Sequence, residues 1–338
     1  MSELAGRISG AWGSWDGPVV ESVVFGTSDP EAIAAAIESW VSDVLGSRID
    51  SVHDYFASVG VTAVLGLSDG REVAVKVHQP LLTPRYLGAV RALQEHLYRS
   101  RFPCPAPIAG PSPCGLGNAT AAARVQLPTN GGAPDPVASM AALARLTLYA
   151  NDAALHGVDV EALRPHPFVE PAAGSPYPVP HHPAIRLHPD GNDPVDRLAL
   201  GATGVLRNDA GEHVITHADW SPRNVFGDRH GVSMVLDLDS IVICSDARAA
   251  GMAAASWALD AGGEEGVGLA DLERLAAVYQ RIRDQWFDET ADAVFWAAAL
   301  ARLCYIARCE TAVGDPGDAS LTVSVIGQQM LDRALRSA

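Results

Sequence analysis

The spacing of apolar residues in the first hundred positions changes from helical to alternating and back again. Apolar side chains recur every three or four residues between Asp29 and Gly46, which predicts a helix with a capped start and a glycine at its end. Residues 61–67 and 72–78 are mostly apolar and flank the polar stretch 68–71, which predicts two strands joined by a tight turn. Helical spacing returns over residues 84–100.

The second predicted strand has two faces of different chemistry. Because side chains alternate along a strand, the valines at positions 73, 75 and 77 share one face, and the other face carries Ala74, Lys76 and His78. Farther along, five prolines between residues 102 and 113 predict an extended or looped segment. A further strand is predicted over 119–127, and the breaker cluster at 128–132 predicts a hinge between two lobes.

The chain after residue 132 is mainly helical. Apolar stripes predict three helices, marked by Met140 to Ala150, Leu272 to Trp286 and Trp296 to Ala307. We expect the tryptophans and leucines of the last hundred residues to pack in a core. Residues 165–194 are rich in Pro and His and fit no regular element, so this long loop is either functional or mobile.

Composition and charge restrict the classes of partner. The net charge of −16 argues against nucleic acid or an anionic membrane as the main partner. Hydrophobic residues make up 48% of the chain, enough for a large core. The first thirty residues lack the pattern of a signal peptide, and the longest apolar run, 293–301, is far shorter than the ~20 residues of a membrane-spanning helix. We therefore expect a soluble, cytoplasmic protein.

Two residue types have unusual counts. Of the 24 Lys and Arg residues, 23 are Arg and one is Lys76. Arg in place of Lys, with abundant Ala, is typical of a GC-rich genome, so the surplus arginine says little about function. The cysteines number five and form no C-x-x-C pair, which predicts buried free thiols rather than a zinc site or a disulfide framework.

The histidines of the long irregular segment raise the question of a metal site. Four of them could serve as ligands: His166, His181, His182 and His188. Their spacing is irregular, unlike the ligand spacing of zinc sites. Solvated loop residues are therefore the favoured interpretation.

Two short polar islands interrupt the helical half of the chain. The first is residues 217–225, HADWSPRNV, directly after the apolar run 214–216. The second is residues 234–240, MVLDLDS, in which three apolar residues lead to Asp237 at a strand end. Between the islands, turn residues at 227–231 predict a hairpin.

The residue types in these islands predict metal-assisted phosphoryl transfer. Mg²⁺ prefers hard oxygen ligands, usually one or two from carboxylates, and Asp237 and the amide oxygen of Asn224 can supply them. Asp219 lies five residues before Asn224, where it could accept the proton of an attacking hydroxyl and orient that hydroxyl. Such a reaction requires positioning and charge neutralisation rather than covalent chemistry by the protein.

The ordered set of motifs resembles one known family. The H-x-D-x4-N motif at 217–224 and the D-x-D motif at 237–239 are similar to the catalytic and metal-binding loops of the aminoglycoside phosphotransferase and choline kinase family. The V-A-V-K segment at 73–76 resembles the third strand of the protein-kinase-like fold of that family. The resemblance spans residues 50 to 260, most of the chain.

The resemblance implies a fold and a set of roles. The fold would be α+β and bilobal, with a β-rich N-terminal lobe at 1–127 and a mainly helical C-terminal lobe at 128–338. By resemblance, the roles in phosphoryl transfer fall to five residues: Asp219 as catalytic base, Asn224 and Asp237 as Mg²⁺ ligands, Lys76 as the clamp on the α- and β-phosphates of ATP, and His217 as a brace of the loop.

Further roles concern the nucleotide. By the same resemblance, Ala74 would lie near the adenine, and backbone groups from Val125 through Leu127 would bind the adenine edge. Ser58 would hold phosphate, since the phosphate-covering loop at 55–60 has only one glycine. Glu95 would align Lys76, with the adjacent Gln94 as the alternative.

Four other positions differ from the family or have two interpretations. Ala218 stands where the family usually has Gly, and Trp220 and Arg223 are less usual in this loop. Arg223 could contact phosphate or form a salt bridge. Asp239 could be a second metal ligand or a structural hydrogen-bond acceptor.

The implied activity is the transfer of the γ-phosphate of ATP, with Mg²⁺, to a hydroxyl of a small molecule such as an aminoglycoside or other antibiotic, a sugar or an amino alcohol. The negative net charge would suit a cationic acceptor. The alternative is a nucleotide-binding pseudokinase with a scaffolding or regulatory role. A protein kinase is disfavoured, because no Ala-Pro-Glu anchor follows Asp237. The sequence does not identify the acceptor, the choice of ATP or GTP, or the oligomeric state.

Overall fold

The structure is a computed structural model that describes residues 2–11, 17–126, 132–164, 166, 169–228, 230–262, 267–314 and 317–336. Its contacts divide the chain into two compact units. Unit 1 comprises Met1–Tyr98, Pro105–Gln126 and His181–Ala184, and unit 2 comprises Arg99–Cys104, Leu127–Pro180 and Ile185–Ala338. The predicted hinge at 128–132 lies almost wholly outside the described residues, which resume at Gly132.

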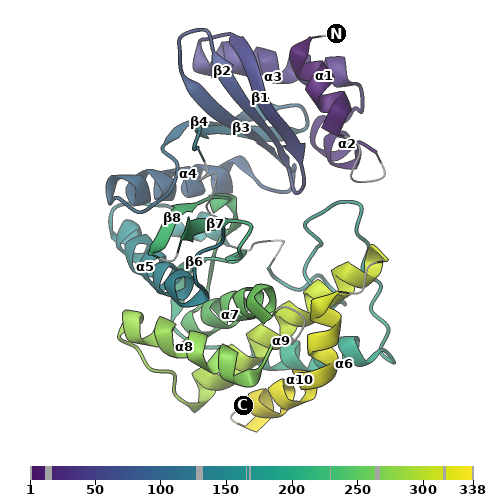
Figure 1. Ribbon diagram of the computed structural model, residues 1–338, viewed down its shortest axis with the longest axis vertical. Helices are drawn as coiled ribbons and strands as arrows, with labels where there is room; N and C mark the ends of the chain where they lie inside the picture. The colour runs from purple at the N-terminus through teal and green to yellow at the C-terminus, as the bar shows by residue number, and fades with distance from the viewer. Residues whose placement is uncertain are drawn as a thin grey trace. The chain divides into compact units, whose positions relative to one another are not determined.

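Unit 1 is built around a five-stranded antiparallel sheet (Figure 1). The strand order is β1-β2-β3-β5-β4, and the strands are β1 Ile49–Ala57, β2 Val61–Leu67, β3 Glu72–His78, β4 Pro107–Cys114 and β5 Gly117–Ala123. β2 and β3 begin and end where the alternation and the tight turn predict. β1 is an addition to the sequence prediction, because charged and polar residues interrupt its pattern.

β4 forms where the prolines predicted an extended or looped chain. Proline removes a hydrogen-bond donor, so it is tolerated in strands chiefly at sheet edges. β4 is an edge strand, paired only with β5, and its register with β5 is irregular around Ala109 and Ser112. The Trp40 indole donates a hydrogen bond of 2.7 Å to the Ser112 hydroxyl. β5 is shorter than predicted, since it ends at Ala123 rather than near residue 127.

Helices complete the core of unit 1. They are α1 Glu3–Gly10, α2 Val19–Phe25, α3 Pro30–Leu45 and α4 Pro84–Arg99. α3 has the predicted ends: the Asp29 carboxylate caps the first turn, and Gly46 follows the last turn in the left-handed conformation. Buried residues of α1, α2 and α3 form one apolar cluster with residues of β1 to β3, including the three valines of β3.

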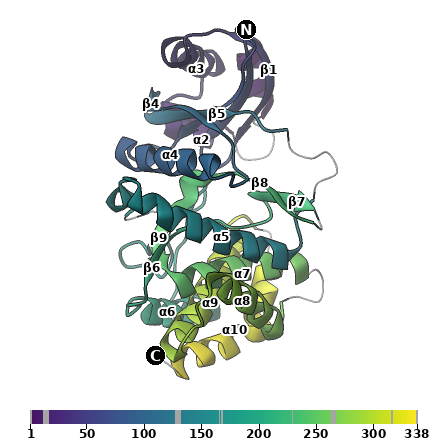
Figure 2. The same ribbon diagram turned by 90° about the vertical axis from the view of Figure 1, so that its left-hand side faces the viewer.

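Unit 2 is mainly helical, as predicted. Its α-helices are α5 Pro136–Leu155, α6 Pro194–Leu206, α7 Asp246–Gly262, α8 Leu269–Arg283, α9 Glu289–Ala312 and α10 Asp318–Arg336. Two short antiparallel pairs accompany them: β6 His213–His217 with β9 Ile241–Ser245, and β7 Val225–Asp228 with β8 Gly231–Val235. Figure 2 shows α7, α8, α9 and α10 gathered together, with α5 beside β7 and β8. The predicted hairpin between the two polar islands is the β7–β8 pair.

The long segment before α6 has little regular structure. Among its described residues, a 3-10 turn covers Val160–Leu163 and a single bridge joins Pro171 to Pro178. The expectation that its histidines are solvated is wrong for His166 and His182, which are buried. Burial also lowers the pKa of both imidazoles, so they are neutral near pH 7.

α9 is the apolar centre of unit 2. It packs against α6, α7 and α10, and it extends well beyond the apolar run noted in the sequence. This helix is long and apolar enough to cross a membrane, with a mean hydropathy of 1.3 over its most apolar window. Because 67% of that window is buried inside the structure, and core helices pass the same test, this is weak evidence for a membrane segment.

One aromatic residue of the predicted helical stripes is not in the core. Trp286 is 68% exposed, because α8 ends three residues earlier at Arg283. Asp284 takes the left-handed conformation after α8, and the Gln285 backbone N–H donates 3.1 Å to the Gln280 carbonyl oxygen. The Gln280 side chain in turn accepts from the Phe287 N–H at 2.7 Å. This capped turn directs Trp286 out of the helical stripe.

All five cysteines are free, and four of them are buried. Burial raises the pKa of the Cys244 thiol to about 12, and the thiols of Cys104 and Cys114 shift in the same way. These cysteines are therefore protonated, inert side chains, which confirms the prediction of free thiols.

A buried polar cluster joins α7 to α8. The Asp246 carboxylate accepts the hydroxyl hydrogen bond of Tyr279, and it pairs with the Arg283 guanidinium at 2.9 Å. All three side chains are buried. A buried ion pair of this kind contributes little net stability over an apolar replacement, but removal of one partner leaves the other charge unpaired.

We therefore expect Asp246→Ala to destabilise the protein by about 3–5 kcal/mol, measured by urea denaturation. The matched control is Asp332→Ala, which removes an exposed hydrogen bond with Gln328 on α10 and should change stability by about 0.5 kcal/mol or less. Equal effects of the two substitutions would contradict this account of the cluster.

Candidate active site

The first polar island is a loop fixed at both ends by unit 2. β6 delivers His217, which pairs with Ile241 of β9, and the next residue, Ala218, donates its N–H to the Ser240 carbonyl oxygen at 2.9 Å. The indole of Trp220 is buried, and it donates to the hydroxyl of Ser139 on α5 at 2.8 Å. The unusual tryptophan in this loop thus anchors it to a helix.

His217 joins the two polar islands through its ring nitrogens. Nδ1 accepts the backbone N–H of Asp219 at 3.2 Å, so Nε2 carries the proton and donates to the Leu236 carbonyl oxygen at 3.2 Å. Burial lowers the pKa of His217, although nearby Asp219, Asp237 and Asp239 act in the opposite direction. The neutral ring braces the loop, which is the geometry that the proposed supporting role requires.

Asp219 and Asn224 are held together by the amide of Asn224. Its Nδ2 donates to the Asp219 carboxylate oxygen Oδ2 at 2.8 Å and to the Asp219 carbonyl oxygen at 2.9 Å. Because both partners are acceptors, the nitrogen must point toward Asp219, and the amide oxygen Oδ1 points away. The loop therefore presents an oxygen of Asn224 that no described residue engages.

Asp219 also contacts a residue that the sequence reasoning missed. Arg302 of α9 donates from Nη2 to the second carboxylate oxygen, Oδ1, at 2.5 Å. The two residues are 83 positions apart, so no local motif connects them. The one signal in the sequence is the position of Arg302, a charged residue that directly follows the apolar run 293–301.

A backbone hydrogen bond joins the second island to Asn224, next to Asp237. The Leu236 N–H donates to the Asn224 carbonyl oxygen at 2.8 Å, and Asp237 follows directly. Asp237 adopts the left-handed conformation, with φ 58°, ahead of the short helix Leu238–Ser240. This conformation is uncommon outside glycine, although aspartate tolerates it better than most residues. Asp239 accepts, through its carbonyl oxygen, a hydrogen bond of 3.3 Å from the ring of His166.

The nucleotide residues expected in unit 1 lie on or near the sheet. Lys76 and Ala74 are half-buried on the β3 face opposite the valines, and Lys76 pairs in register with Thr62 and Thr120. Ser58 is exposed in the turn between β1 and β2. Both Lys76 and Glu95 have interactions with other groups.

Four further expected positions have mixed outcomes. The amide of Gln94 donates to the Pro105 carbonyl oxygen at 2.8 Å, so its donor is directed to a backbone group of unit 1. Val125 follows β5 in an irregular segment, whereas Leu127 lies outside the described residues. Arg223 is exposed and forms no ion pair with any described residue, so the salt bridge considered for it is not observed there.

The comparison with protein families decides the identity of the chain. A profile of the phosphotransferase enzyme family matches residues 61–284, more than half of the sequence. The chain belongs to the phosphotransferase enzyme family. This membership confirms the resemblance and the expectation of a phosphotransferase. A comparison with curated proteins gives no match.

Solved structures similar to this phosphotransferase share its fold. An amicoumacin kinase in complex with AMP-PNP, Ca²⁺ and Ami is 9% identical, with a TM-score of 0.59 over 90% of this chain and 96% of that chain. A protein assigned to the aminoglycoside phosphotransferases, from Ralstonia eutropha JMP134, is 15% identical, with a TM-score of 0.52 over 90% and 97%. A spectinomycin phosphotransferase with ADP and spectinomycin is 11% identical, with 0.50 over 90% and 98%. The predicted α+β fold is confirmed.

The β1–β2 turn of this phosphotransferase has its own support in place of a glycine-rich sequence. Its one glycine, Gly60, packs so closely on β3 that a Cβ atom there would lie 2.6 Å from the Val77 carbonyl oxygen. Gln79, buried just after β3, donates from Nε2 to the carbonyl oxygens of Val59 at 2.6 Å and His181 at 2.8 Å. Gln79 therefore ties the turn to the segment 181–184 of the long irregular region.

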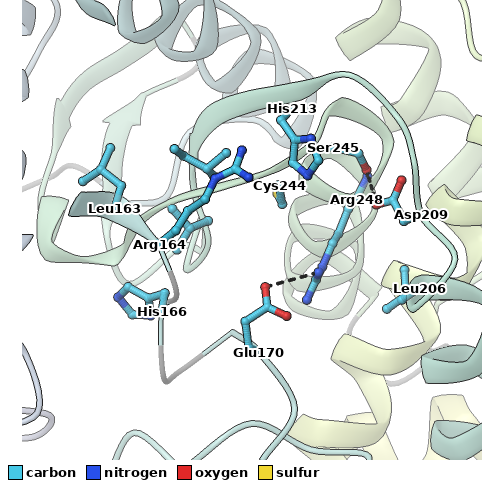
Figure 3. Close-up of a pocket in the computed structure, with 12 residues that line it drawn as sticks. Leu163, Arg164, His166, Glu170, Leu206, Asp209, His213, Cys244, Ser245 and Arg248 are labelled. Atoms are coloured by element: carbon cyan, nitrogen blue, oxygen red, sulfur yellow. Dashed lines mark hydrogen bonds and ion pairs between the residues drawn. The ribbon is translucent and has the colours of Figure 1, made fainter. Parts of the chain in front are cut away.

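A cavity of about 190 Å³ lies beside β9, and Figure 3 shows its lining. The Arg248 guanidinium pairs with the Glu170 carboxylate at 3.5 Å and donates to the Val169 carbonyl oxygen at 3.2 Å. On the same wall, the Ser245 hydroxyl donates to the Asp209 carboxylate at 2.6 Å. These four side chains of the cavity wall thus bond to one another or to the backbone.

We expect Gln79→Met to destabilise the phosphotransferase by about 1–3 kcal/mol, because two part-buried hydrogen bonds from a buried side chain are lost while side-chain length is kept. Urea denaturation measures the change. Gln328→Met, which removes an exposed hydrogen bond to Asp332 at 2.8 Å, is the control. A Gln79 variant as stable as the Gln328 variant would show that the turn does not depend on this amide.

Proposed function

We propose that this chain catalyses the Mg²⁺-dependent transfer of the γ-phosphate of ATP to a hydroxyl group of a small molecule. The observation that carries the proposal is the joint placement of Asp219, Asn224 and Asp237. His217 joins the two islands through one ring, and the Asn224 amide fixes the Asp219 carboxylate. Oxygen-bearing side chains on two islands that hydrogen bonds join suit a reaction that needs orientation of a hydroxyl and neutralisation of phosphate charge.

Asp219 is the proposed catalytic base. Its side chain is 28% exposed, so an acceptor hydroxyl can reach it although both of its oxygens already accept hydrogen bonds. Each carboxylate oxygen has a further lone pair. Asp219 would accept the hydroxyl proton and direct the hydroxyl oxygen toward the γ-phosphate, while the Asn224 and Arg302 donors keep the carboxylate from rotating.

The residues present fit a Mg²⁺ ion. The amide nitrogen of Asn224 points toward Asp219, so its Oδ1 atom points away from Asp219. Asp237 contributes a carboxylate shortly after the end of β8. Both are hard oxygen donors, the type that Mg²⁺ prefers. We propose that Asn224 and Asp237 hold the ion, with Asp239 as a second carboxylate ligand or a structural acceptor. The ion, when bound, neutralises charge on the phosphates.

In unit 1 we propose Lys76 as the group that holds the α- and β-phosphates. It is the one lysine of the chain, and a compact ammonium differs from the planar, forked guanidinium that replaces it elsewhere. Glu95 would align Lys76, Ser58 would contact phosphate from the β1–β2 turn, and Ala74 would lie near the adenine. Backbone groups at Val125 and Leu127 would bind the adenine edge.

The similar structures support a nucleotide and a small hydroxylated acceptor. The amicoumacin kinase holds AMP-PNP and the spectinomycin phosphotransferase holds ADP with its antibiotic. We propose the same classes for this chain: an aminoglycoside or other antibiotic, a sugar or an amino alcohol. Nucleic acid and membrane are not part of the proposal, and its setting is the cytoplasm. The lobes would correspond to residues 1–127 and 128–338.

The decisive experiment is a Mg²⁺-dependent kinase screen across antibiotics, sugars and amino alcohols, with detection of the phosphorylated acceptor. Addition of EDTA should abolish turnover, because the phosphate charge is then not neutralised. Thermal stabilisation by ATP without turnover of any compound would instead favour a pseudokinase that binds nucleotide.

Asp219→Asn should lower kcat by about 10²–10⁴-fold, the usual contribution of a general base, and should leave the affinity for ATP largely unchanged. The measurement is steady-state turnover together with ATP titration by calorimetry. Asn retains the shape of the side chain and can accept from Asn224, although its amide nitrogen then faces the Arg302 donor, so thermal unfolding of the variant is the fold control. Near-normal turnover would remove Asp219 from the role of base.

Lys76→Arg keeps the positive charge but should lower kcat/KM for ATP by about 10²-fold, in line with the loss of one preorganised charge contact. The physical reason is the larger, planar guanidinium in place of an ammonium. Thermal unfolding of the variant serves as the fold control. Unimpaired phosphoryl transfer would mean that the persistence of one lysine at this position is accidental.

A further inference from the structure

Arg302 is held firmly at the candidate base yet retains unused donors. Its Nε donates to the Ser256 hydroxyl at 3.1 Å, and Ser256 in turn donates to the Met252 carbonyl oxygen of α7 at 3.2 Å. Its Nη2 donates to Asp219. A guanidinium has five N–H groups, and no other hydrogen bond joins Arg302 to the described residues. Two helices therefore fix a cation whose outer edge, Nη1 included, remains available.

The two oxygens of Asp219 face different groups. Oδ2 accepts from Asn224, the proposed metal ligand, whereas Oδ1 accepts from Arg302 of α9. With Oδ2 directed toward the metal-binding amide, an incoming hydroxyl would share Oδ1 with Arg302. The Arg302 guanidinium would then lie next to the part of the acceptor molecule that carries this hydroxyl.

The other buried arginines of the helical unit are matched by carboxylates or carbonyl groups of the protein. Arg283 pairs with Asp246, and Arg308, two turns along α9 from Arg302, pairs with both Asp193 and Asp196. Among the described residues, Arg302 pairs with one carboxylate, that of Asp219, and the acceptor hydroxyl would share that carboxylate with it. The positive charge of Arg302 thus cancels the negative charge of Asp219 locally, although the net charge of the whole chain is negative.

We propose that Arg302 is a specificity residue that binds a carboxylate of the acceptor, so that the acceptor is a hydroxy acid rather than an ammonium compound. This inference rests on the proposed phosphoryl transfer, and among the proposed acceptors it favours sugar derivatives or antibiotics that carry a carboxylate over aminoglycosides and amino alcohols. A guanidinium fork matches a carboxylate with two parallel hydrogen bonds. An ammonium group has only donors, so it cannot accept hydrogen bonds from the remaining guanidinium N–H groups.

The test uses acceptors that differ in one group on a common frame. Gluconate, sorbitol and 1-amino-1-deoxysorbitol carry a carboxylate, an alcohol and an ammonium, and glycerate, glycerol and 3-amino-1,2-propanediol form a second series. Binding is measured by calorimetry with Mg²⁺ and AMP-PNP present, and turnover with ATP. The carboxylate member of at least one series should bind at least about tenfold more tightly than its partners, a difference of about 1.4 kcal/mol.

Arg302→Gln separates recognition from a merely structural role. It should remove the preference by raising the KM of the carboxylate acceptor about tenfold or more, and Arg302→Lys should restore part of it. The KM for ATP should stay within about twofold in both variants. Arg274→Gln, an exposed arginine of α8 with 56% of its side chain accessible, is the control and should leave the preference intact.

Several results would overturn the inference. These are tighter binding of the alcohol or ammonium members, no binding of any carboxylate member, or an undiminished preference in Arg302→Gln. An equal fall in kcat for every acceptor would assign Arg302 to holding Asp219 only. Failure of the proposed function gives a different result, which is no phosphorylated product from any compound in the wider kinase screen.

Discussion

The paired hydrogen bonds from the Asn224 amide to Asp219 are the constraint on which the candidate site depends. They fix the carboxylate, and because an amide has one nitrogen and one oxygen, they also decide where the Asn224 oxygen points. His217 extends this constraint to the second island, since its neutral ring contacts the backbone at both Asp219 and Leu236. One connected set of hydrogen bonds thereby joins Asp219, the proposed base, and Asn224, a proposed metal ligand, to the second island.

The charges around this loop are compensated group by group. Burial keeps His217 neutral even though three carboxylates lie near it, so the ring cannot neutralise them. Arg302 offsets Asp219, and a bound Mg²⁺ ion would offset Asp237. The charge at the candidate site is therefore set by these local pairs. The net charge of −16 governs the attraction of cations at long range, but it does not determine the charge of the acceptor site. For the same reason, a cationic acceptor does not follow from the composition.

Local signals in the sequence were sufficient for some of the fold and for the motif residues. α3, β2 and β3 have the predicted ends because a cap, a glycine and a tight turn define them. The prolines of β4 left an extended or a looped chain open, since their tolerance in a strand depends on an edge position that only the sheet provides. Arg302 and Gln79 were missed because their contacts lie 83 and 102 residues away along the chain. No spacing rule connects such pairs.

The most direct test is a crystal structure with Mg²⁺ and AMP-PNP. The account predicts a metal ion coordinated by Asn224 Oδ1 and an Asp237 carboxylate oxygen, at about 2.1 Å from each, with phosphate oxygens among its other ligands. Asp219 would then lie on the far side of the Asn224 amide from the ion. A nucleotide bound without metal at these two residues, or an Asn224 amide turned so that its nitrogen faces the ion, would contradict the account.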